Sequence, residues 1–432
     1  MPSVKGFDPG TKVYESLDED GNTVRINPWA KMAEEVGSFE QHIERMNSDT
    51  QDTSQEILDD VVKKVGGVEK IDKILHRDNS QFVNTIQNEK ISSLEDELDL
   101  TSSNYAKRHP EYQNFKEEMI GHIDDLHNRG LLYADVAKVW LNPNLMSGGT
   151  NWTTNYYVLY DKMRKRNIDN ITEDEFVTDK DRFHDRMIEF VKEFKKDQIT
   201  IQDEHERKPD RLADIHNAIK DGNFLHFNAD EHGEVDLRYY LTTKNGKSAE
   251  GLRIFFESLD EVGLKDKLYF KIATGSDRLD NIVIYKSDKI NDDEMTNLLK
   301  TIAEKNSQSN GILEDDSSRT LPIAKINDGI GIGAEPDYIN RYLRLAGIES
   351  NKTHSYNTFL AKIIDNSIRI ASARLNTGKE KYTKQKGKYM NKASINEMLS
   401  LDNEDMKEEM MGVMKEFLRL AKINPNTMMP EK

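Results

Sequence analysis

Cysteine is absent from all 432 residues of the chain. This excludes disulfide bonds, thiolate ligands for a metal and a cysteine nucleophile. The sequence also lacks a run of about 18 apolar residues, which a transmembrane helix needs. The N-terminus has no apolar segment of the kind found in secretory signal peptides. We therefore expect no membrane span and no membrane partner, while export by a specialised system that reads a polar N-terminus stays compatible with the sequence.

Basic charge is scarce relative to acidic charge. The chain has 61 Lys and Arg residues against 78 Asp and Glu residues, which gives a formal net charge of −17. Broad nucleic-acid binding requires basic patches that neutralise phosphates, so we expect no nucleic-acid partner. A small local basic site remains compatible with this balance.

Recognisable metal-binding motifs are missing too. His122 and His127 are five residues apart, which places them on different faces of a helix. The segment "NADEHGEVDLRY" alternates polar residues as a calcium loop does, but its twelfth position is Tyr239 where such a loop needs glutamate. We interpret this segment as a plain hairpin turn between two strands, and we expect neither a metal nor any other cofactor.

Glycine is concentrated in "NDGIGIGAEPD", residues 327–337, which matches neither the dinucleotide-binding nor the Walker spacing. We interpret it as a tight turn that presents backbone amides to a pocket. The preceding "RTLPIAKI" reads as a strand that Pro322 confines to the edge of a sheet.

Hydrophobic periodicity divides the chain into three parts. Residues 1–28 are polar and rich in turn formers, so they predict a flexible arm with a short hairpin. Residues 29–205 repeat the helical spacing of apolar residues and predict a helical domain. In residues 206–432, strand and helix patterns mix before a helical tail. The predicted fold class is α+β, with a helical N-terminal half followed by a small mixed β-sheet domain that carries helices on it.

Charged residues interrupt the strands of this last part. Lys271 lies inside "LYFKI", and Arg238 lies inside "LRYYL". Successive side chains of a strand point to opposite faces, so one face of a shared sheet would collect four polar side chains. These are Arg238, Tyr240, Tyr269 and Lys271, with Arg278 and Asp280 at the rim of the same face.

Two interpretations fit this pattern. It is either a solvated sheet face whose long side chains extend into water, or an anion site. Arginine binds phosphate or carboxylate through paired hydrogen bonds, and neighbouring cations lower the pKa of a lysine so that its neutral amine becomes a base.

The order of these motifs resembles the HopA-type effector domain family. The similar features are the Arg-Tyr-Tyr strand, an amphipathic helix, the Phe-Lys strand, the arginine and aspartate of "RLD", and "IVIYK", then "LPIAKINDGIGIGAEPD" and "HSYNTFLAKIIDNSI". Together they cover about residues 220–375. The family includes type III effectors of plant-pathogenic bacteria and lyases that act on phosphoserine and phosphothreonine in lanthipeptide-type peptides.

The resemblance implies β-elimination of phosphate from serine or threonine of a protein or peptide, without a cofactor. It assigns Lys271 as the base, Tyr240 or His354 as the proton donor, and Arg238, Arg278, Asp280, Gly331 and Gly333 as the phosphate-binding group.

The resemblance also implies a virulence protein that is delivered into a host cell or resides in the bacterial cytoplasm. A host protein or a secretion chaperone would then be a further partner. An alternative is a catalytically inactive member of the family that serves as a protein-interaction scaffold. A structural protein without a pocket is a third reading, and it requires Arg238 and Lys271 to point into bulk solvent.

Overall fold

A computed structural model of the chain describes thirteen segments. These are residues 14–17, 23–26, 53–65, 108, 110–141, 156–166, 171–202, 206–230, 233–275, 278–315, 324–345, 355–377 and 404–431. The chain forms two compact units. Unit 1 comprises residues 1–48, 166–321 and 325–332, and unit 2 comprises residues 49–165, 322–324 and 333–432. The boundary expected near residue 205 thus falls inside unit 1.

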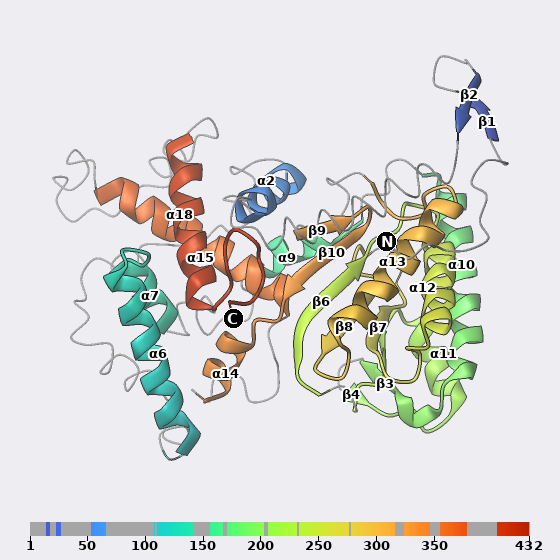
Figure 1. Cartoon of the computed structure of the whole chain (residues 1–432), viewed down its shortest axis with the longest axis horizontal. Coiled ribbons are helices and arrows are strands. Elements are labelled where there is room, and N and C mark those ends of the chain that lie inside the picture. Colours follow the sequence, from blue (N-terminus) through green and yellow to red (C-terminus); the bar gives the residue numbers. More distant parts are fainter. Residues whose placement is uncertain are drawn as a thin grey trace, which may run out of the picture. The chain divides into compact units, whose positions relative to one another are not determined.

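An eight-stranded sheet forms the centre of unit 1, in the order β4-β3-β5-β7-β8-β6-β10-β9 (Figure 1). Its strands are β3 (Ile199–Gln202), β4 (Glu206–Arg207), β5 (Phe224–Phe227), β6 (Val235–Leu241), β7 (Tyr269–Ala273), β8 (Ile282–Ser287), β9 (Ala324–Asn327) and β10 (Ile330–Ala334). The pairings from β4 across to β6 are antiparallel. The predicted α+β class is confirmed, and β9 occupies a sheet edge as expected.

The sheet order corrects one prediction from the sequence. β5 and β6 do not form a hairpin, because β7 and β8 lie between them and β5 pairs with β3 and β7. Apolar alternation locates a strand but does not select its partner, and β6 finds its antiparallel partner in β8.

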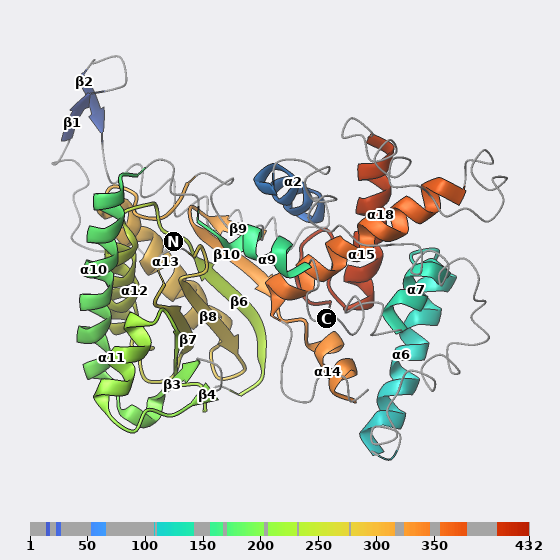
Figure 2. The ribbon, with the colours of Figure 1, turned by 180° about the vertical axis from the view of Figure 1, so that it is seen from behind.

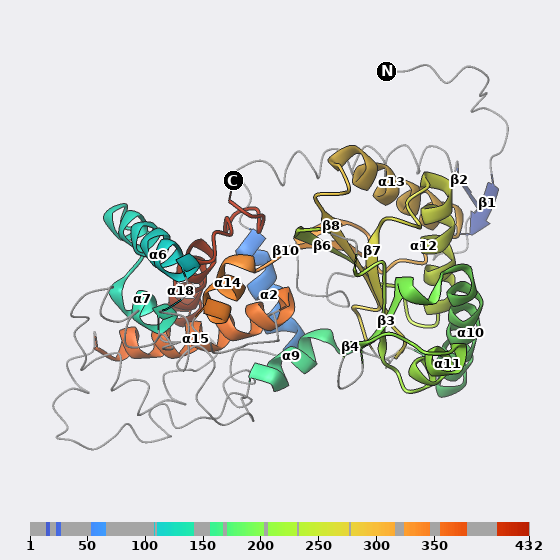
Figure 3. The same cartoon turned by 90° about the horizontal axis from the view of Figure 1, so that it is seen from below.

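Four helices accompany this sheet: α10 (Glu173–Phe190), α11 (Leu212–Lys220), α12 (Ser248–Val262) and α13 (Asp292–Gln308). Figures 1 and 3 show α10 and α12 along one side of the sheet. Capping boxes fix the starts of α10 and α13, and α12 ends at Gly263, whose φ of 69° is accessible to glycine without strain.

Aromatic packing decides which face of the sheet these helices cover. The rings of Phe227 on β5 and Phe270 on β7 stack with their centroids 4.7 Å apart. Phe255 and Phe256 of α12 meet the Phe270 ring edge-on, at 5.1 and 5.8 Å. Residues of even number on β7 therefore face the helices, and the odd-numbered Tyr269 and Lys271 point to the opposite face.

The described part of unit 2 is mostly helical, apart from the ends of β9 and β10 that belong to it (Figure 2). Its helices are α2 (Thr53–Val65), α6 (Pro110–Asn128), α7 (Ala134–Leu141), α9 (Tyr156–Arg164), α14 (Asp337–Leu345), α15 (Tyr356–Thr377) and α18 (Glu404–Leu420). Trp140 and Phe417 are fully buried, and their rings lie 6.5 Å apart in its core.

Near the N-terminus, β1 (Tyr14–Leu17) and β2 (Thr23–Ile26) pair antiparallel, which confirms the hairpin expected in the arm. Among the described residues, no helix has both the length and the apolar character needed to cross a membrane.

Candidate functional site

The strand register places the predicted polar residues on one face of the sheet. Arg238, Tyr285 and Tyr269 form one row across β6, β8 and β7. Tyr240, Val283 and Lys271 form the next row, which His226 of β5 continues. The face opposite the helices thus carries the four residues that strand alternation brought together in the sequence.

Two aromatic rings connect three cations on this face. Nζ of Lys271 lies 4.6 Å from the centroid of the Phe224 ring and 5.8 Å from that of the Tyr285 ring. Cζ of Arg238 lies 5.0 Å from the Tyr285 centroid, and Cζ of Arg278 lies 4.6 Å from the Phe224 centroid. We refer to these five residues as the cationic cluster.

Lys271 differs from Arg278, because it has no carboxylate partner among the described residues. Within the described part of the chain, its ammonium group makes only the two ring contacts and no ion pair. Cation–π contacts contribute about 0.5–2 kcal/mol and leave the net charge in place. A half-buried charge that is held among other cations favours the arrival of an anion. By contrast, Arg238 is only 8% exposed, which contradicts a solvated face from which Arg238 points into bulk water.

The rim of the cluster is fixed by a bidentate ion pair. Nε and Nη2 of Arg278 each donate to a different carboxylate oxygen of Asp280, both at 2.7 Å. Arg166 anchors the same segment, because its Nη2 donates to the Arg278 carbonyl and its Nη1 to the Thr243 carbonyl. Arg166 is buried, and nothing in the sequence pattern pointed to it.

A tyrosine, a histidine and a glutamine form a hydrogen-bonded chain beside the cluster. Nδ1 of His226 lies 2.8 Å from the Tyr269 hydroxyl, and Nε2 lies 2.9 Å from Oε1 of Gln202. The Tyr269 ring stacks on the Tyr285 ring, with centroids 4.0 Å apart and planes at 10°. The sequence interpretation missed His226, although the alternation of "NFLHF" places it on the same face as Phe224.

The remaining predicted site residues lie elsewhere or in different surroundings. Tyr240 shares the face but is only 2% exposed. Gly331 and Gly333 are buried positions inside β10, whereas the tight turn is formed by residues 328–329. His354 lies outside the described residues.

Gly333 is held close to a ring. A Cβ atom built on Gly333 would lie 2.8–3.0 Å from ring atoms of Tyr356. This glycine therefore lets the Tyr356 ring lie against the backbone at Gly333, and both residues belong to unit 2.

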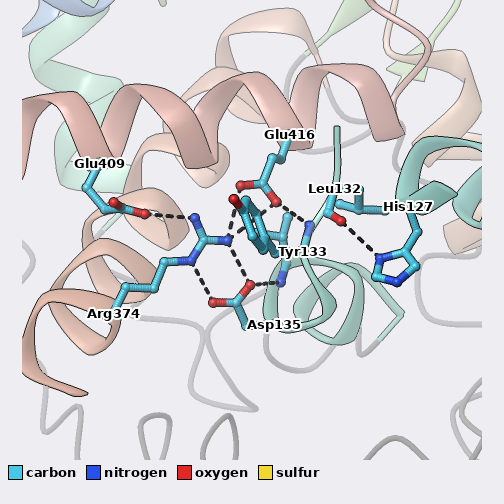
Figure 4. A network of polar contacts seen from close by, with 8 residues as sticks. His127, Leu132, Tyr133, Asp135, Arg374, Glu409 and Glu416 are labelled. Atoms are coloured by element: carbon cyan, nitrogen blue, oxygen red, sulfur yellow. Dashed lines mark hydrogen bonds and ion pairs between the residues drawn. The ribbon is translucent and has the colours of Figure 1, made fainter. Parts of the chain in front are cut away.

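A second cluster of charges lies in unit 2 (Figure 4). Arg374 of α15 pairs with both carboxylate oxygens of Asp135 at 2.8 Å, with Glu409 at 2.8 Å and with Glu416 at 3.1 Å. The Tyr133 amide also donates to Glu416, at 2.8 Å. Burial alone would lower the pKa of Arg374, but the hydrogen bonds to Asp135 and Glu409 raise it. This network joins α7, α15 and α18 and has the character of a structural junction. Among the described residues, no group of three or more histidine, aspartate or glutamate side chains has the arrangement of a metal site.

Comparison with known proteins adds one distant similarity. No family model matches the chain, and no curated protein matches it. A solved effector protein from Pseudomonas syringae pv. syringae strain 61 aligns with 50% of this chain and 84% of its own, at 11% sequence identity and a TM-score of 0.32. That TM-score lies below the range that indicates a shared fold.

Proposed function

We propose that the chain is an effector-like protein of the HopA type. Its sheet face would bind a phosphorylated serine or threonine of a protein or peptide and remove the phosphate by β-elimination. The observation that carries the proposal is Lys271, which has no carboxylate partner among the described residues and lies between two rings that also contact Arg238 and Arg278.

The roles follow from the chemistry of each side chain. The neutral amine of Lys271 would remove the Cα proton, and the electron pair of that bond would form the Cα–Cβ double bond. The Cβ–O bond would break, with its electrons passing to the leaving phosphate. Arg238 contacts the same ring as Lys271 and would neutralise the charge that develops on the phosphate. Arg278 would add a second cation, oriented by Asp280.

A mixed library of phosphoserine and phosphothreonine peptides tests this reaction by mass spectrometry. The expected product has lost one phosphoric acid per site and carries a double bond, so an added thiol couples to it. A phosphatase leaves a hydroxyl group that does not couple. Neither a metal nor a nucleotide is added to the assay.

The matched variants are Lys271→Ala and Lys286→Ala. Lys286 lies on the neighbouring strand β8, where it pairs with Asp236 and Asp292. We expect Lys271→Ala to abolish the product and Lys286→Ala to retain it. A folded wild-type protein that leaves every peptide unchanged would overturn the lyase proposal.

A binding scaffold is the second candidate. The Arg278–Asp280 pair favours it, because Asp280 compensates one of the three cationic charges before any ligand arrives. Tight binding of a phosphopeptide by the wild-type protein, measured by fluorescence anisotropy and without turnover, would support the scaffold.

A further inference from the structure

The Tyr269–His226–Gln202 chain is the feature of the sheet face that the roles above leave unused. Tyr269 is partly exposed, while Tyr240 on the adjacent strand row is 2% exposed. A proton donor must reach the leaving oxygen within hydrogen-bond distance. Of the two tyrosines, Tyr269 is therefore the more exposed one, and its hydroxyl lies within hydrogen-bond distance of His226.

The geometry points to Tyr269 as the proton donor of the site. His226 positions the Tyr269 hydroxyl and returns a proton to it after each transfer. This inference rests on the proposed lyase reaction and replaces Tyr240 and His354 in that role. It also makes turnover depend on the protonation of His226, so that the site is regulated by pH.

The hydrogen-bond pattern defines which protons can move. The carboxamide oxygen of Gln202 only accepts hydrogen bonds, so Nε2 of His226 carries a hydrogen in both charge states. In neutral His226, Nδ1 therefore accepts the hydrogen of the Tyr269 hydroxyl. In the imidazolium form Nδ1 donates to the Tyr269 oxygen instead, so the hydroxyl hydrogen of Tyr269 is no longer donated to His226.

The proton relay balances with the elimination. Lys271 gains the proton from Cα as the Cβ–O bond breaks. The Tyr269 hydroxyl gives its hydrogen to the leaving phosphate oxygen, and Nδ1 of His226 returns a proton to the phenolate oxygen. The products are the dehydro residue, hydrogen phosphate, charged Lys271 and neutral His226, and no oxidant or other reactant is needed.

The surroundings of His226 are compatible with this cycle. His226 is 6% exposed and stacks near the Tyr269 ring, with centroids 5.9 Å apart. Across the sheet it lies opposite Thr200 on one side and Lys271 on the other. Tyr269 and Lys271 are thus the titratable groups that face it from β7, and Gln202 and Thr200 face it from β3. A bound phosphate dianion on this face would favour the imidazolium form by charge attraction.

The first measurement is the pH profile of phosphate release from a phosphothreonine peptide. The variants are Tyr269→Phe and His226→Gln, with Tyr239→Phe as a control, because Tyr239 lies on the helix-covered face of β6. We expect Tyr269→Phe to lower kcat by about 100-fold or more, with little change in KM. We expect His226→Gln to remove the decline of kcat with rising pH. An unchanged profile in both variants, beside an active wild-type protein, would overturn the relay.

A second measurement distinguishes a failure of the relay from a failure of the lyase reaction. The chain has 11 histidines, so selective 15N labelling with His226→Gln for assignment isolates the ring signals. The phosphothreonine peptide is expected to move the His226 titration to higher pH in the wild-type protein, and by a smaller amount in Tyr269→Phe, which lacks the hydroxyl group between His226 and the phosphate. If no phosphate is released but this difference is seen, the lyase proposal fails and the link from phosphate to His226 stands. If the peptide binds and leaves the His226 titration unchanged, the relay is wrong.

Discussion

Arg278 and Asp280 form a bidentate ion pair, two residues apart, at the rim of the sheet face. The two side chains are 14% and 6% exposed, so water screens their interaction weakly. The pair holds Cζ of Arg278 4.6 Å from the centroid of the Phe224 ring and compensates the charge of the guanidinium at the same time.

Breaking this pair should therefore change stability and binding in opposite directions. Removing one partner of a buried pair leaves a desolvated charge, so we expect Asp280→Asn to lower the free energy of unfolding by about 3 kcal/mol. The released positive charge of Arg278 should tighten the binding of a phosphopeptide. Urea denaturation and fluorescence anisotropy measure the two effects.

An ion pair of the same sheet whose carboxylate is exposed provides the control. Asp236 is 54% exposed and pairs with Lys286. Asp236→Asn should change the unfolding free energy by less than about 1 kcal/mol and leave phosphopeptide binding unaltered. Equal destabilisation by the two variants would show that the Arg278–Asp280 pair behaves as an ordinary surface contact.

Gly333 should tolerate no side chain. The Cβ of Gly333→Ala would overlap the Tyr356 ring, and Tyr356 is fully buried, so the ring has no room to move away. We expect a loss of about 1–3 kcal/mol in the free energy of unfolding. The control is Gly412→Ala in α18, where an added Cβ meets nothing within 4 Å. Because alanine favours helices, this control should gain about 0.5–1 kcal/mol, and two similar thermal denaturation midpoints would contradict the packing argument.

The placement of Arg238 and Lys271 was predictable from the sequence, because strand alternation alone fixes which residues share a face. The strands that pair with the strands carrying these residues were not predictable. Alternation gave β5 and β6 as a hairpin, whereas the sheet inserts β7 and β8 between them. A strand's partner depends on the packing of the whole sheet, and one sequence does not contain that information in a local pattern.

The polar contacts between residues far apart in the chain could not be predicted from the sequence either. Arg166 and the Arg278 carbonyl are 112 positions apart, and the contact between His226 and Tyr269 spans 43. No local periodicity marks either contact. The glycine pattern was misleading for a different reason: Gly331 and Gly333 alternate because they line a strand, and a strand and an extended loop look alike when the residues are glycine.

The charge network of unit 2 predicts a specific pH dependence. Burial raises the pKa of the Glu416 carboxyl above its ordinary value of 4.5, although the Tyr133 amide and Arg374 act in the opposite direction. The folded state then holds this proton more tightly than the unfolded state. The contribution of Glu416 to stability is thus complete below about pH 4.5 and is lost as the pH rises through the pKa of the folded state.

Replacing the titrating group should remove that loss. We expect Glu416→Gln to show a smaller decline in unfolding free energy above pH 4.5 than the wild-type protein, measured by urea denaturation at a series of pH values. Glu409→Gln alters the same Arg374 guanidinium but retains Glu416, so it should preserve the wild-type decline. Parallel pH profiles for wild type and Glu416→Gln would refute the assignment.

Among the residues around the rim of the site, Arg166 is the one whose substitution should disturb the rim most. Its guanidinium bridges two segments, with Nη1 at 3.0 Å from the Thr243 carbonyl and Nη2 at 3.2 Å from the Arg278 carbonyl. The ammonium group of Arg166→Lys is a single point and cannot span both acceptors. We expect a loss of about 2–3 kcal/mol in unfolding free energy, because one buried carbonyl is left unsatisfied.

Phosphopeptide affinity should fall in the same variant, since the Arg278 segment loses its anchor. Arg164→Lys tests the specificity of this effect, because Arg164 is partly exposed on α9 and pairs with the exposed Asp161. It should change neither stability nor affinity beyond about 0.5 kcal/mol. If Arg166→Lys weakens the fold and leaves affinity intact, then Arg278 is held by its pair with Asp280 alone, and Arg166 belongs to the core of unit 1 and not to the binding face.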